Sequence, residues 1–457
     1  MATKKTKDKE VKPMSKGSIS MEDYDDKFSS DLGSFLGKSM GLSIESLDEH
    51  ENIHYWIPSG CLSLNWIISN QFFNGIPGSK AVLIAGESES GKSLITDALL
   101  GQNIQMGGMS MKVDIEDSAG YDFTAQIVGS KEIASKIKII SPATNAALTK
   151  EVVDDGDEDD GGKKGKGGKL KKVITVESLT QLINKVLDFQ ESRKEKKSKS
   201  VMMVVDSVTQ MTSEKEFADI AANKDKRDMT SAQKIRALFR AVTQRLRGNN
   251  TTIIGIAHLT ANIGDMFGPK FVVNAKGTGF AYASTLTLLM MKSKEMIDAK
   301  TGTPIGLKLR IKTHKNRCAL KGRSAWMKFY FAKGIDKYGG LCDLLAQYGV
   351  FKPSKQSISK FDFEYDEKTK FTYVKEDGSA ISFKEKDFPA IVEENGGDAF
   401  LQELNDRLNA VYQNIMDGDV EDFAMAMEDE TDIAMEGDNG EEAEYEEGDE
   451  VESGDEY

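Results

Sequence analysis

Gly86-Glu87-Ser88-Glu89-Ser90-Gly91-Lys92-Ser93 is the strongest indicator of the fold, because it follows the pattern G-x-x-x-x-G-K-[ST] between a predicted strand and a predicted helix. Residues 81–85 are an apolar run typical of a short buried strand, and residues 94–100 continue with apolar side chains at helical spacing. A loop in this position can wrap a polyphosphate with inward-facing N–H groups. We expect Lys92 to reach the outer phosphates and Ser93 to ligate Mg²⁺; a Gly- and Ser-rich turn without a ligand is the alternative.

The composition indicates a soluble protein larger than one typical domain. With 457 residues, about two folded units plus tails are expected. The three cysteines show no C-x-x-C spacing, which argues against a disulfide framework or a zinc site and indicates a reducing compartment. No apolar run approaches the roughly 20 residues that a membrane-spanning helix needs. We therefore expect a cytoplasmic protein that does not contact membranes.

The net charge of −14 conceals a strong asymmetry along the chain. Residues 417–457 hold 20 Asp and Glu and no Lys or Arg, which leaves the first 416 residues with a net charge of +6. An acidic tail of this kind is often a solvated, disordered appendage. It can also compete with nucleic acid for the cationic surface of the body, and both interpretations stay open here.

The apolar patterns divide the chain into four regions. Residues 1–56 are a Lys-rich arm followed, within 21–40, by near-helical spacing that predicts a helix packing on a neighbouring subunit. Residues 57–350 alternate helical and strand-like runs, which predicts an α/β core with a mostly parallel central sheet. Residues 351–416 predict a small C-terminal α+β subdomain with a hairpin and a helix, before the acidic, disordered tail at 417–457.

Two features of the core are local. An Asp-, Gly- and Lys-rich insert at about 152–172 cannot bury a core, and we expect a solvent loop there. Residues 307–313 and 325–331 look like two strands joined by a turn, so the sheet is expected to end in an antiparallel pair.

Carboxylates follow two of the predicted core strands. The strand at 111–115 continues into Glu116, and the apolar run at 201–205 delivers Asp206. Ligands of open α/β sheets collect at the carboxyl ends of the strands, so we expect Glu116 to deprotonate an attacking water and Asp206 to hold Mg²⁺. Each acid alone is better explained by a surface or capping role, but their joint order after the phosphate loop favours the functional one. His258 ends another strand, where it either contacts a γ-phosphate or is a satisfied histidine.

Several motifs together resemble the RecA-type homologous recombinases over residues 57 to about 350. These are Ser59 to Asn65, Asn74 to Gly78, the phosphate loop, Asp114 to Glu116, Val204 to Ser207, Ala281 to Ser284 and Gly334 to Gly340. Asp228 to Thr230, Leu238 to Arg240 and a histidine at 258, where bacterial RecA carries Gln, are more similar to the UvsX-like branch of large tailed phages. The resemblance implies a RecA-like P-loop ATPase core that uses ATP and Mg²⁺.

The resemblance also implies roles for individual residues. Glu116 falls at the family's catalytic glutamate, and Phe123 falls where an aromatic ring stacks on adenine, with Tyr121 as the alternate and a core aromatic as the other interpretation. Lys315 and Arg317 align with a Lys-x-Lys pair that reaches the ATP of the neighbouring subunit, although two cations after a strand can also be an exposed face. The expected catalytic residues are Glu116, Lys92, His258, Lys315 and Arg317.

Two predicted loops supply the expected DNA contacts. The first, at about 214–228, ends in a basic cluster, and the second, at 262–282, combines lysines, glycines and phenylalanines as a flexible loop on single-stranded DNA would. A solvated charged face and core phenylalanines are the alternatives. The expected DNA-contacting residues are Lys226, Arg227, Lys270, Lys276, Gly277, Gly279 and Phe280, together with Arg236 from the helix after the first loop.

These expectations favour a DNA-dependent ATPase that forms helical filaments on single-stranded DNA and catalyses homologous pairing and strand exchange with double-stranded DNA. Recombination mediators and single-strand-binding proteins are expected partners, and a phage-encoded chain would act in the host cytoplasm. The leading alternative is a RecA-fold hexameric helicase, for which the first 56 residues are shorter than a typical helicase N-terminal domain. A non-catalytic ATP-binding DNA scaffold is a third class.

Overall fold

The computed structural model of the chain describes residues 26–40, 53–118, 120–142, 149–152, 171–193, 199–221, 230–261, 271–273, 275–359, 363–417 and 433–435. The chain divides into two units, Met1–Asn52 and Ile53–Tyr457. The described part of the first unit is the helix α1 (Asp26–Met40), which confirms the helix expected within 21–40. The Lys-rich start at 1–25 lies outside the described residues.

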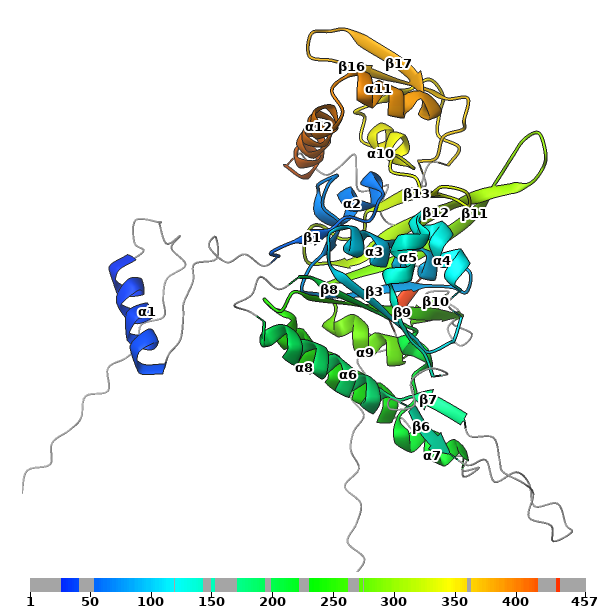
Figure 1. Cartoon of the computed structure of the whole chain (residues 1–457). Helices are drawn as coiled ribbons and strands as arrows, with labels where there is room; N and C mark the ends of the chain where they lie inside the picture. The colour runs from blue at the N-terminus through cyan, green and yellow to red at the C-terminus, as the bar shows by residue number, and fades with distance from the viewer. Residues whose placement is uncertain are drawn as a thin grey trace, which may run out of the picture. The chain divides into compact units, whose positions relative to one another are not determined.

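One large sheet organises the second unit (Figure 1). Its strand order is β14 (Gly334–Ile335), β13 (Ser324–Tyr330), β12 (Pro304–Asn316), β11 (Leu286–Ile297), β3 (Ala81–Gly86), β9 (Thr251–Ala261), β8 (Val201–Asp206), β4 (Met109–Asp114) and β5 (Lys138–Ile140). Neighbouring strands are parallel from β11 to β5 and antiparallel from β11 to β14. The predicted mostly parallel sheet with an antiparallel end is therefore confirmed.

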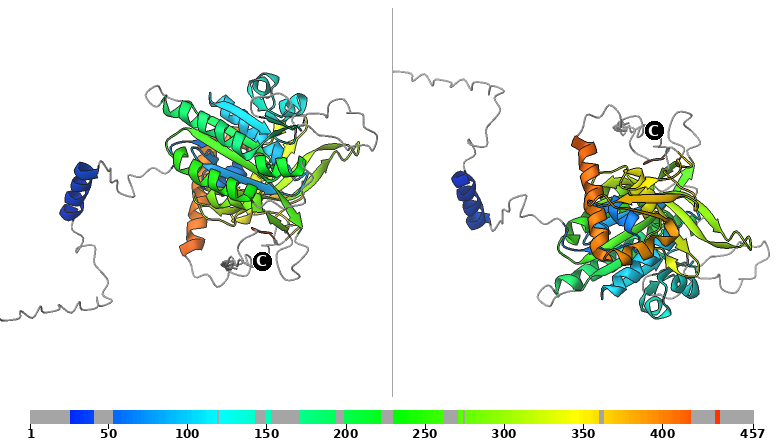
Figure 2. Two further views of the ribbon diagram at one scale, coloured as in Figure 1. Left: turned by 90° about the horizontal axis from the view of Figure 1, so that it is seen from below. Right: turned by 90° about the horizontal axis from the view of Figure 1, so that it is seen from above.

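Helices cover both faces of this sheet. One face carries α2 (Leu62–Ser69), α3 (Lys92–Gln105), α4 (Tyr121–Val128) and α5 (Lys131–Lys136), and the other carries α6 (Val176–Glu191), α8 (Thr230–Leu246) and α9 (Ala275–Ala283). Figure 2 shows α6 and α8 side by side across the lower face. In β3, Val82 and Ile84 join the core beneath α2 and α3, whereas Leu83 and Ala85 join the core of α6, α8 and α9. A parallel strand buried on both faces must be apolar throughout, as residues 81–85 are.

The C-terminal part adds α10 (Leu341–Gln347), β15 (Lys352–Pro353), β16 (Lys370–Val374), β17 (Ala380–Lys384), α11 (Phe388–Glu394) and α12 (Asp398–Asp417). The expected hairpin is the antiparallel pair β16–β17, and the expected helix is α12. Phe351 packs against the rings of Phe371, Tyr373, Phe383 and Phe388. These rings belong to the same apolar cluster as the residues beneath α2 and α3, so the C-terminal part shares its core with the sheet. A short antiparallel pair, β1 (Trp56–Ile57) and β2 (Ile76–Pro77), precedes β3.

The two predicted DNA loops contain regular structure, so the expectation of irregular loops was wrong there. The insert expected at about 152–172 lies outside the described residues from 153 to 170, and the strands that flank it, β6 (Thr149–Val152) and β7 (Lys171–Ile174), form an antiparallel pair. The predicted first DNA loop begins with α7 (Glu214–Ala221), whose first turn carries acidic residues that favour a helix N-terminus. The predicted second DNA loop contains β10 (Phe271–Val273), which is antiparallel to β9, and then α9.

Candidate functional site

The phosphate loop connects the end of β3 to the start of α3, in the strand–loop–helix arrangement that the sequence predicted. Gly91, directly before α3, has φ of 88°, a left-handed conformation that glycine adopts easily. A Cβ on Gly86 would lie 2.4 Å from Ser90 Oγ and 2.7 Å from Met290 Cβ, so a larger residue would collide. The two glycines of the motif therefore allow the tight turn at the head of α3.

Lys92 begins α3, and only 4 % of its surface is exposed. Its ammonium donates to the carbonyl oxygen of Glu87 inside the loop. Burial lowers the pKa of Lys92, and the carboxylates of Asp206 and Glu116 oppose that effect. A buried ammonium beside a helix N-terminus is well placed to bind phosphate oxygens.

The outer side of the loop borders an open cavity of about 310 Å³. Glu87, Ser88 and Glu89 are exposed there, whereas Ser90 is buried. Lys294 of β11 also lines this cavity. The loop is therefore accessible to a ligand from solvent.

Ser93 and Asp206 meet at the carboxyl edge of the sheet. The Ser93 hydroxyl donates to Asp206 Oδ2 at 3.1 Å. Asp206 is the last residue of β8, which is buried along its whole length, so its carboxylate lies where the strand ends. Hydroxyl and carboxylate oxygens are the donors that Mg²⁺ prefers, and the pair fits the expected metal site. Among the described residues, no group of three or more His, Cys, Asp or Glu side chains is arranged to hold a metal ion.

Glu116 and His258 contact each other at the same edge. Glu116 Oε1 lies 3.0 Å from His258 Nε2. In the parallel register of β3 and β9, His258 is the partner of Gly86, so it lies directly beside the first glycine of the phosphate loop. Its backbone N–H donates to Thr209 Oγ1 at 3.3 Å. About a quarter of each side chain is exposed, 25 % for Glu116 and 27 % for His258, so a ligand in the loop can reach both.

A buried lysine that the sequence analysis missed joins this site. The ammonium of Lys112, in β4, lies 3.1 Å from Asp97 Oδ1 and 3.3 Å from Asp206 Oδ2. Thr124 Oγ1 donates to the other oxygen of Asp97 at 2.9 Å. Burial disfavours the charge on Lys112, but Asp97 and then Asp206 outweigh it and raise its pKa. The available signal was a lysine inside the predicted strand at residues 111–115, which by itself does not show whether the charge is buried.

The two candidate adenine-stacking rings lie on α4. Phe123 and Tyr121 are both 51 % exposed, so neither is a core aromatic. The Tyr121 hydroxyl donates to the carbonyl oxygen of Lys131 at 3.1 Å, which ties this ring to α5. Phe123 has no polar group to hold it and is the better placed of the two to receive a base.

Lys315 and Arg317 lie far along the sheet from the phosphate loop of their own chain. The Arg317 N–H donates to Thr285 O at 3.1 Å, and the Thr285 N–H donates to Ala81 O at 2.8 Å. Ala81 is the first residue of β3, whereas the phosphate loop leaves its last residue. Arg317 therefore lies toward the opposite edge of the sheet from the phosphate loop of its own chain.

Lys315 caps the C-terminal end of α9. Its ammonium donates to the carbonyl oxygens of Ala281 and Tyr282, each at 3.0 Å. Carbonyl oxygens in the last turn of a helix lack intrahelical partners, so a cation stabilises them. Burial, and then the charge of Arg317, lower the pKa of Lys315 to about 8.

The predicted DNA-contacting residues are only partly described. Lys226, Arg227 and Lys270 lie outside the described residues, as does the side chain of Lys276. Arg236 is exposed on α8, with its guanidinium 5.2 Å from the centre of the Tyr282 ring. This arrangement leaves Arg236 accessible to an anionic partner.

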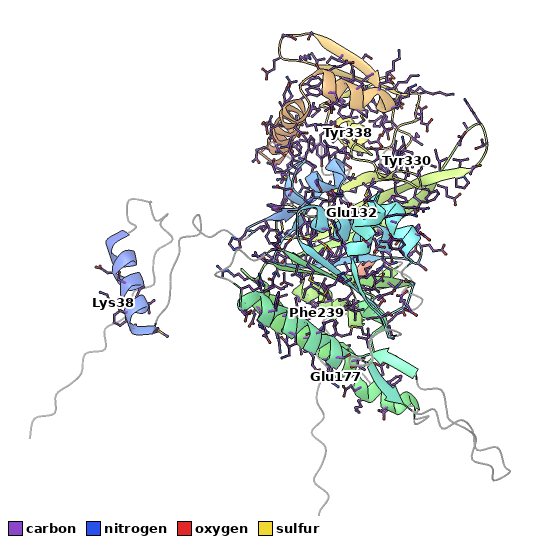
Figure 3. All side chains as sticks on the ribbon, in the orientation of Figure 1. Lys38, Glu132, Glu177, Phe239, Tyr330 and Tyr338 are labelled. Carbon is purple, nitrogen blue, oxygen red and sulfur yellow. The ribbon has the colours of Figure 1, made fainter. Side chains whose placement is uncertain are left out.

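Gly277, Gly279 and Phe280 are packed rather than placed in a loop. Phe280 is fully buried edge-to-face against Phe239, with ring centres 4.1 Å apart; Figure 3 labels Phe239 among the helices of the lower face. A Cβ on Gly279 would lie 3.2 Å from the backbone nitrogen of Arg236, so the glycine lets α9 approach α8 closely. The core-aromatic alternative therefore describes Phe280 in this structure, and a DNA contact by these three residues would require α9 to rearrange.

Comparison with known proteins finds similarity to RecA proteins. Residues 184–336 match the RecA N-terminal domain family. The chain is 25 % identical to protein RecA of Mycoplasma mycoides subsp. mycoides SC over 70 % of this chain and 75 % of that protein. It is 24 % identical to protein RecA of Kineococcus radiotolerans over 65 % of this chain and 71 % of that protein. Protein RecA of Borrelia duttonii is 29 % identical over a shorter part, 34 % of this chain and 41 % of that protein.

The core is RecA-like. The similarity supports the expected RecA-type recombinase and does not favour the helicase alternative. Among the described residues, none of the helices has both the length and the apolar character of a membrane span.

Proposed function

We propose that this chain is a DNA-dependent ATPase of the UvsX-like branch of RecA-type recombinases, which forms filaments on single-stranded DNA and catalyses homologous pairing and strand exchange. The observation that carries the proposal is the convergence of Lys92, Ser93, Asp206 and the Glu116–His258 pair at the carboxyl edge of β3, β9, β8 and β4. Ligands of open α/β sheets bind at this edge. Phosphoryl transfer to water needs a cation for the phosphates, ligands for Mg²⁺ and a group that orients the water, and the side chains at this edge include all three kinds.

Each group has a defined part in hydrolysis. Lys92 and the N–H groups of the loop hold the phosphates, and Ser93 with Asp206 would hold Mg²⁺. When bound, Mg²⁺ neutralises negative charge on the phosphate oxygens. Glu116 orients the attacking water and accepts its proton, because its carboxylate lies beside the loop without being buried. His258 contacts the terminal phosphate from β9 and links its presence to Glu116.

The positions of Lys315 and Arg317 support action between protomers. Because Arg317 lies at the opposite sheet edge from its own phosphate loop, a head-to-tail contact can bring it to the loop of the next subunit. Head-to-tail contacts that do not close generate helical filaments. ATP at such a seam would favour the filament state that holds DNA, and hydrolysis would weaken it.

Electron microscopy with single-stranded DNA and a non-hydrolysable ATP analogue tests this proposal. Helical filaments are expected in the micrographs. In a separate assay with ATP, phosphate release should rise when DNA is added. Closed rings would support a hexameric helicase, and binding of DNA and ATP without DNA-dependent phosphate release would support a non-catalytic scaffold. A protein that stays monomeric with saturating ATP analogue and oligonucleotide would contradict the proposal altogether.

A further inference from the structure

Lys112 contacts the carboxylate that the metal site would use. Its ammonium lies 3.3 Å from Asp206 Oδ2, the same oxygen that accepts the hydrogen bond from Ser93. The side chains of Lys112 and Asp206 are each 3 % exposed, so water screens their attraction only weakly. A cation in this position competes with a divalent ion for the negative charge of Asp206.

Asp97 opposes that competition from the other side. It lies four residues after Ser93 on α3, one turn along the same helix face, and its Oδ1 is 3.1 Å from the Lys112 ammonium. The Thr124 hydroxyl holds its second oxygen at 2.9 Å. A lysine between two carboxylates cannot give its full charge to either one.

We infer that Lys112 and Asp97 form a buried neutral pair that positions Asp206 and sets how strongly the site binds a divalent cation together with a nucleotide. The inference rests on the proposed nucleotide site. Lys112 contacts Asp206, and Asp97 contacts Lys112. Both act through Asp206 rather than on the phosphates, so both are positioning residues. Removing the carboxylate of Asp97 leaves the Lys112 cation to act on Asp206 alone, whereas removing Lys112 leaves the negative charge of Asp97 near Asp206. Removing both charges leaves neither effect.

Binding of a fluorescent ADP analogue to the full chain without DNA, titrated with Mg²⁺, tests the inference. Asp97→Asn should raise the Mg²⁺ concentration needed for half-maximal binding about three- to tenfold, because Lys112 then neutralises Asp206. Lys112→Met should lower that concentration by a similar factor, and the double variant should return to within about twofold of the wild type. Lys136→Met, in the exposed pair with Glu132, is the matched control and should change nothing.

Binding measured in EDTA separates this electrostatic role from a purely structural one. Without Mg²⁺, Lys112→Met should bind the analogue more weakly, because the added negative charge repels the phosphates. A structural defect would instead weaken binding in both buffers. Parallel losses in both buffers, or unchanged Mg²⁺ midpoints in folded variants, would overturn the inference.

Thr124→Val provides a second test if one of the charge variants fails to fold. It removes the hydrogen bond that fixes Asp97 without changing any charge, so it should raise the Mg²⁺ midpoint by less than Asp97→Asn would. An unchanged midpoint in this variant would also count against the inference. A wild-type chain that does not bind the analogue at all would overturn the proposed nucleotide site itself, which distinguishes the two failures.

Discussion

The carboxylate of Glu116 and the imidazole of His258 lie 3.0 Å apart although 142 residues separate them in the sequence. The contact exists because β4 ends beside the phosphate loop and His258 is the register partner of Gly86. His258 lies within β9, which continues to Ala261, so the expectation that it ends this strand was wrong. A phosphate that binds the imidazole would compete with Glu116 for it. The pair therefore connects the occupant of the loop to the carboxylate that would act on water.

Replacing this carboxylate should separate catalysis from binding. Glu116→Gln keeps the size of the side chain and one acceptor oxygen but removes its basicity, so kcat for ATP hydrolysis should fall about 10²- to 10⁴-fold. Nucleotide affinity should change little, because Glu116 does not line the turn that holds the phosphates. Phosphate release and binding of a fluorescent nucleotide measure the two effects. A loss of nucleotide affinity with an unchanged kcat would mean that Glu116 contributes to nucleotide binding and not to the hydrolysis step.

Removing the buried ammonium of the phosphate loop should abolish activity. Lys92→Ala deletes the cation that donates to Glu87 O and leaves the loop without its charge for the phosphates. DNA-stimulated phosphate release should fall to background, while Lys136→Ala, in an exposed ion pair, should retain wild-type release. DNA-stimulated hydrolysis at the wild-type rate in the Lys92 variant would defeat the assignment of the site.

Much of the site could be predicted because its signals are local and strong. The strand–loop–helix at residues 81–100 combines a glycine pattern with an apolar run, and both follow from backbone geometry. Asp206 could be predicted because a six-residue buried strand ends in it. The contact between Glu116 and His258 depends instead on strand order, which no local pattern encodes.

The missed features share a physical cause. Gly277 and Gly279 suggested a flexible loop, but in the structure they allow α9 to approach β10 and α8 closely. The sequence alone cannot distinguish a glycine needed for close packing from one needed for backbone flexibility. Lys112 looked like an ordinary charged residue because its partner Asp97 lies on a different element. Burial of a charge is decided by tertiary contacts, so the strand pattern alone could not reveal it.

Action between protomers can be tested by mixing two inactive variants. Lys92→Ala disables the phosphate loop, and Lys315→Ala with Arg317→Ala disables the cations at the opposite sheet edge. In mixed filaments at equal amounts, about a quarter of the seams should join an intact loop to intact cations, and phosphate release should recover to that extent. If the mixture releases no more phosphate than each variant alone, these cations either act within their own chain or have no part in hydrolysis.

The position of Lys315 predicts a pH-dependent contribution to stability. Its pKa is lowered to about 8, so between that pH and the ordinary lysine value the unfolded chain binds more protons here than the folded chain. The free energy of unfolding therefore gains a term that rises with pH through this window. Thermal unfolding at about pH 7 and about pH 9.5 should show the wild type gaining stability relative to Lys315→Met. A constant difference between the two proteins would contradict the lowered pKa.

The acidic tail should weaken DNA binding, and the structure suggests where it acts. The strand β18 (Ile433–Met435) pairs in parallel with β10, within the segment expected to contact DNA. Deleting residues 417–457 removes 20 carboxylates and frees that edge, so affinity for single-stranded DNA should rise at moderate salt. Fluorescence anisotropy measures the change.

Two further variants separate charge from strand pairing as the cause. Replacing Ile433 and Met435 with proline keeps every carboxylate but removes N–H donors from β18. It should reproduce part of the gain if pairing with β10 holds the tail beside the segment expected to contact DNA. Neutralising the acidic residues after 440 keeps β18 and should reproduce the part that depends on salt. Unchanged affinity in the deletion variant would mean that the tail is a solvated appendage that does not compete with DNA.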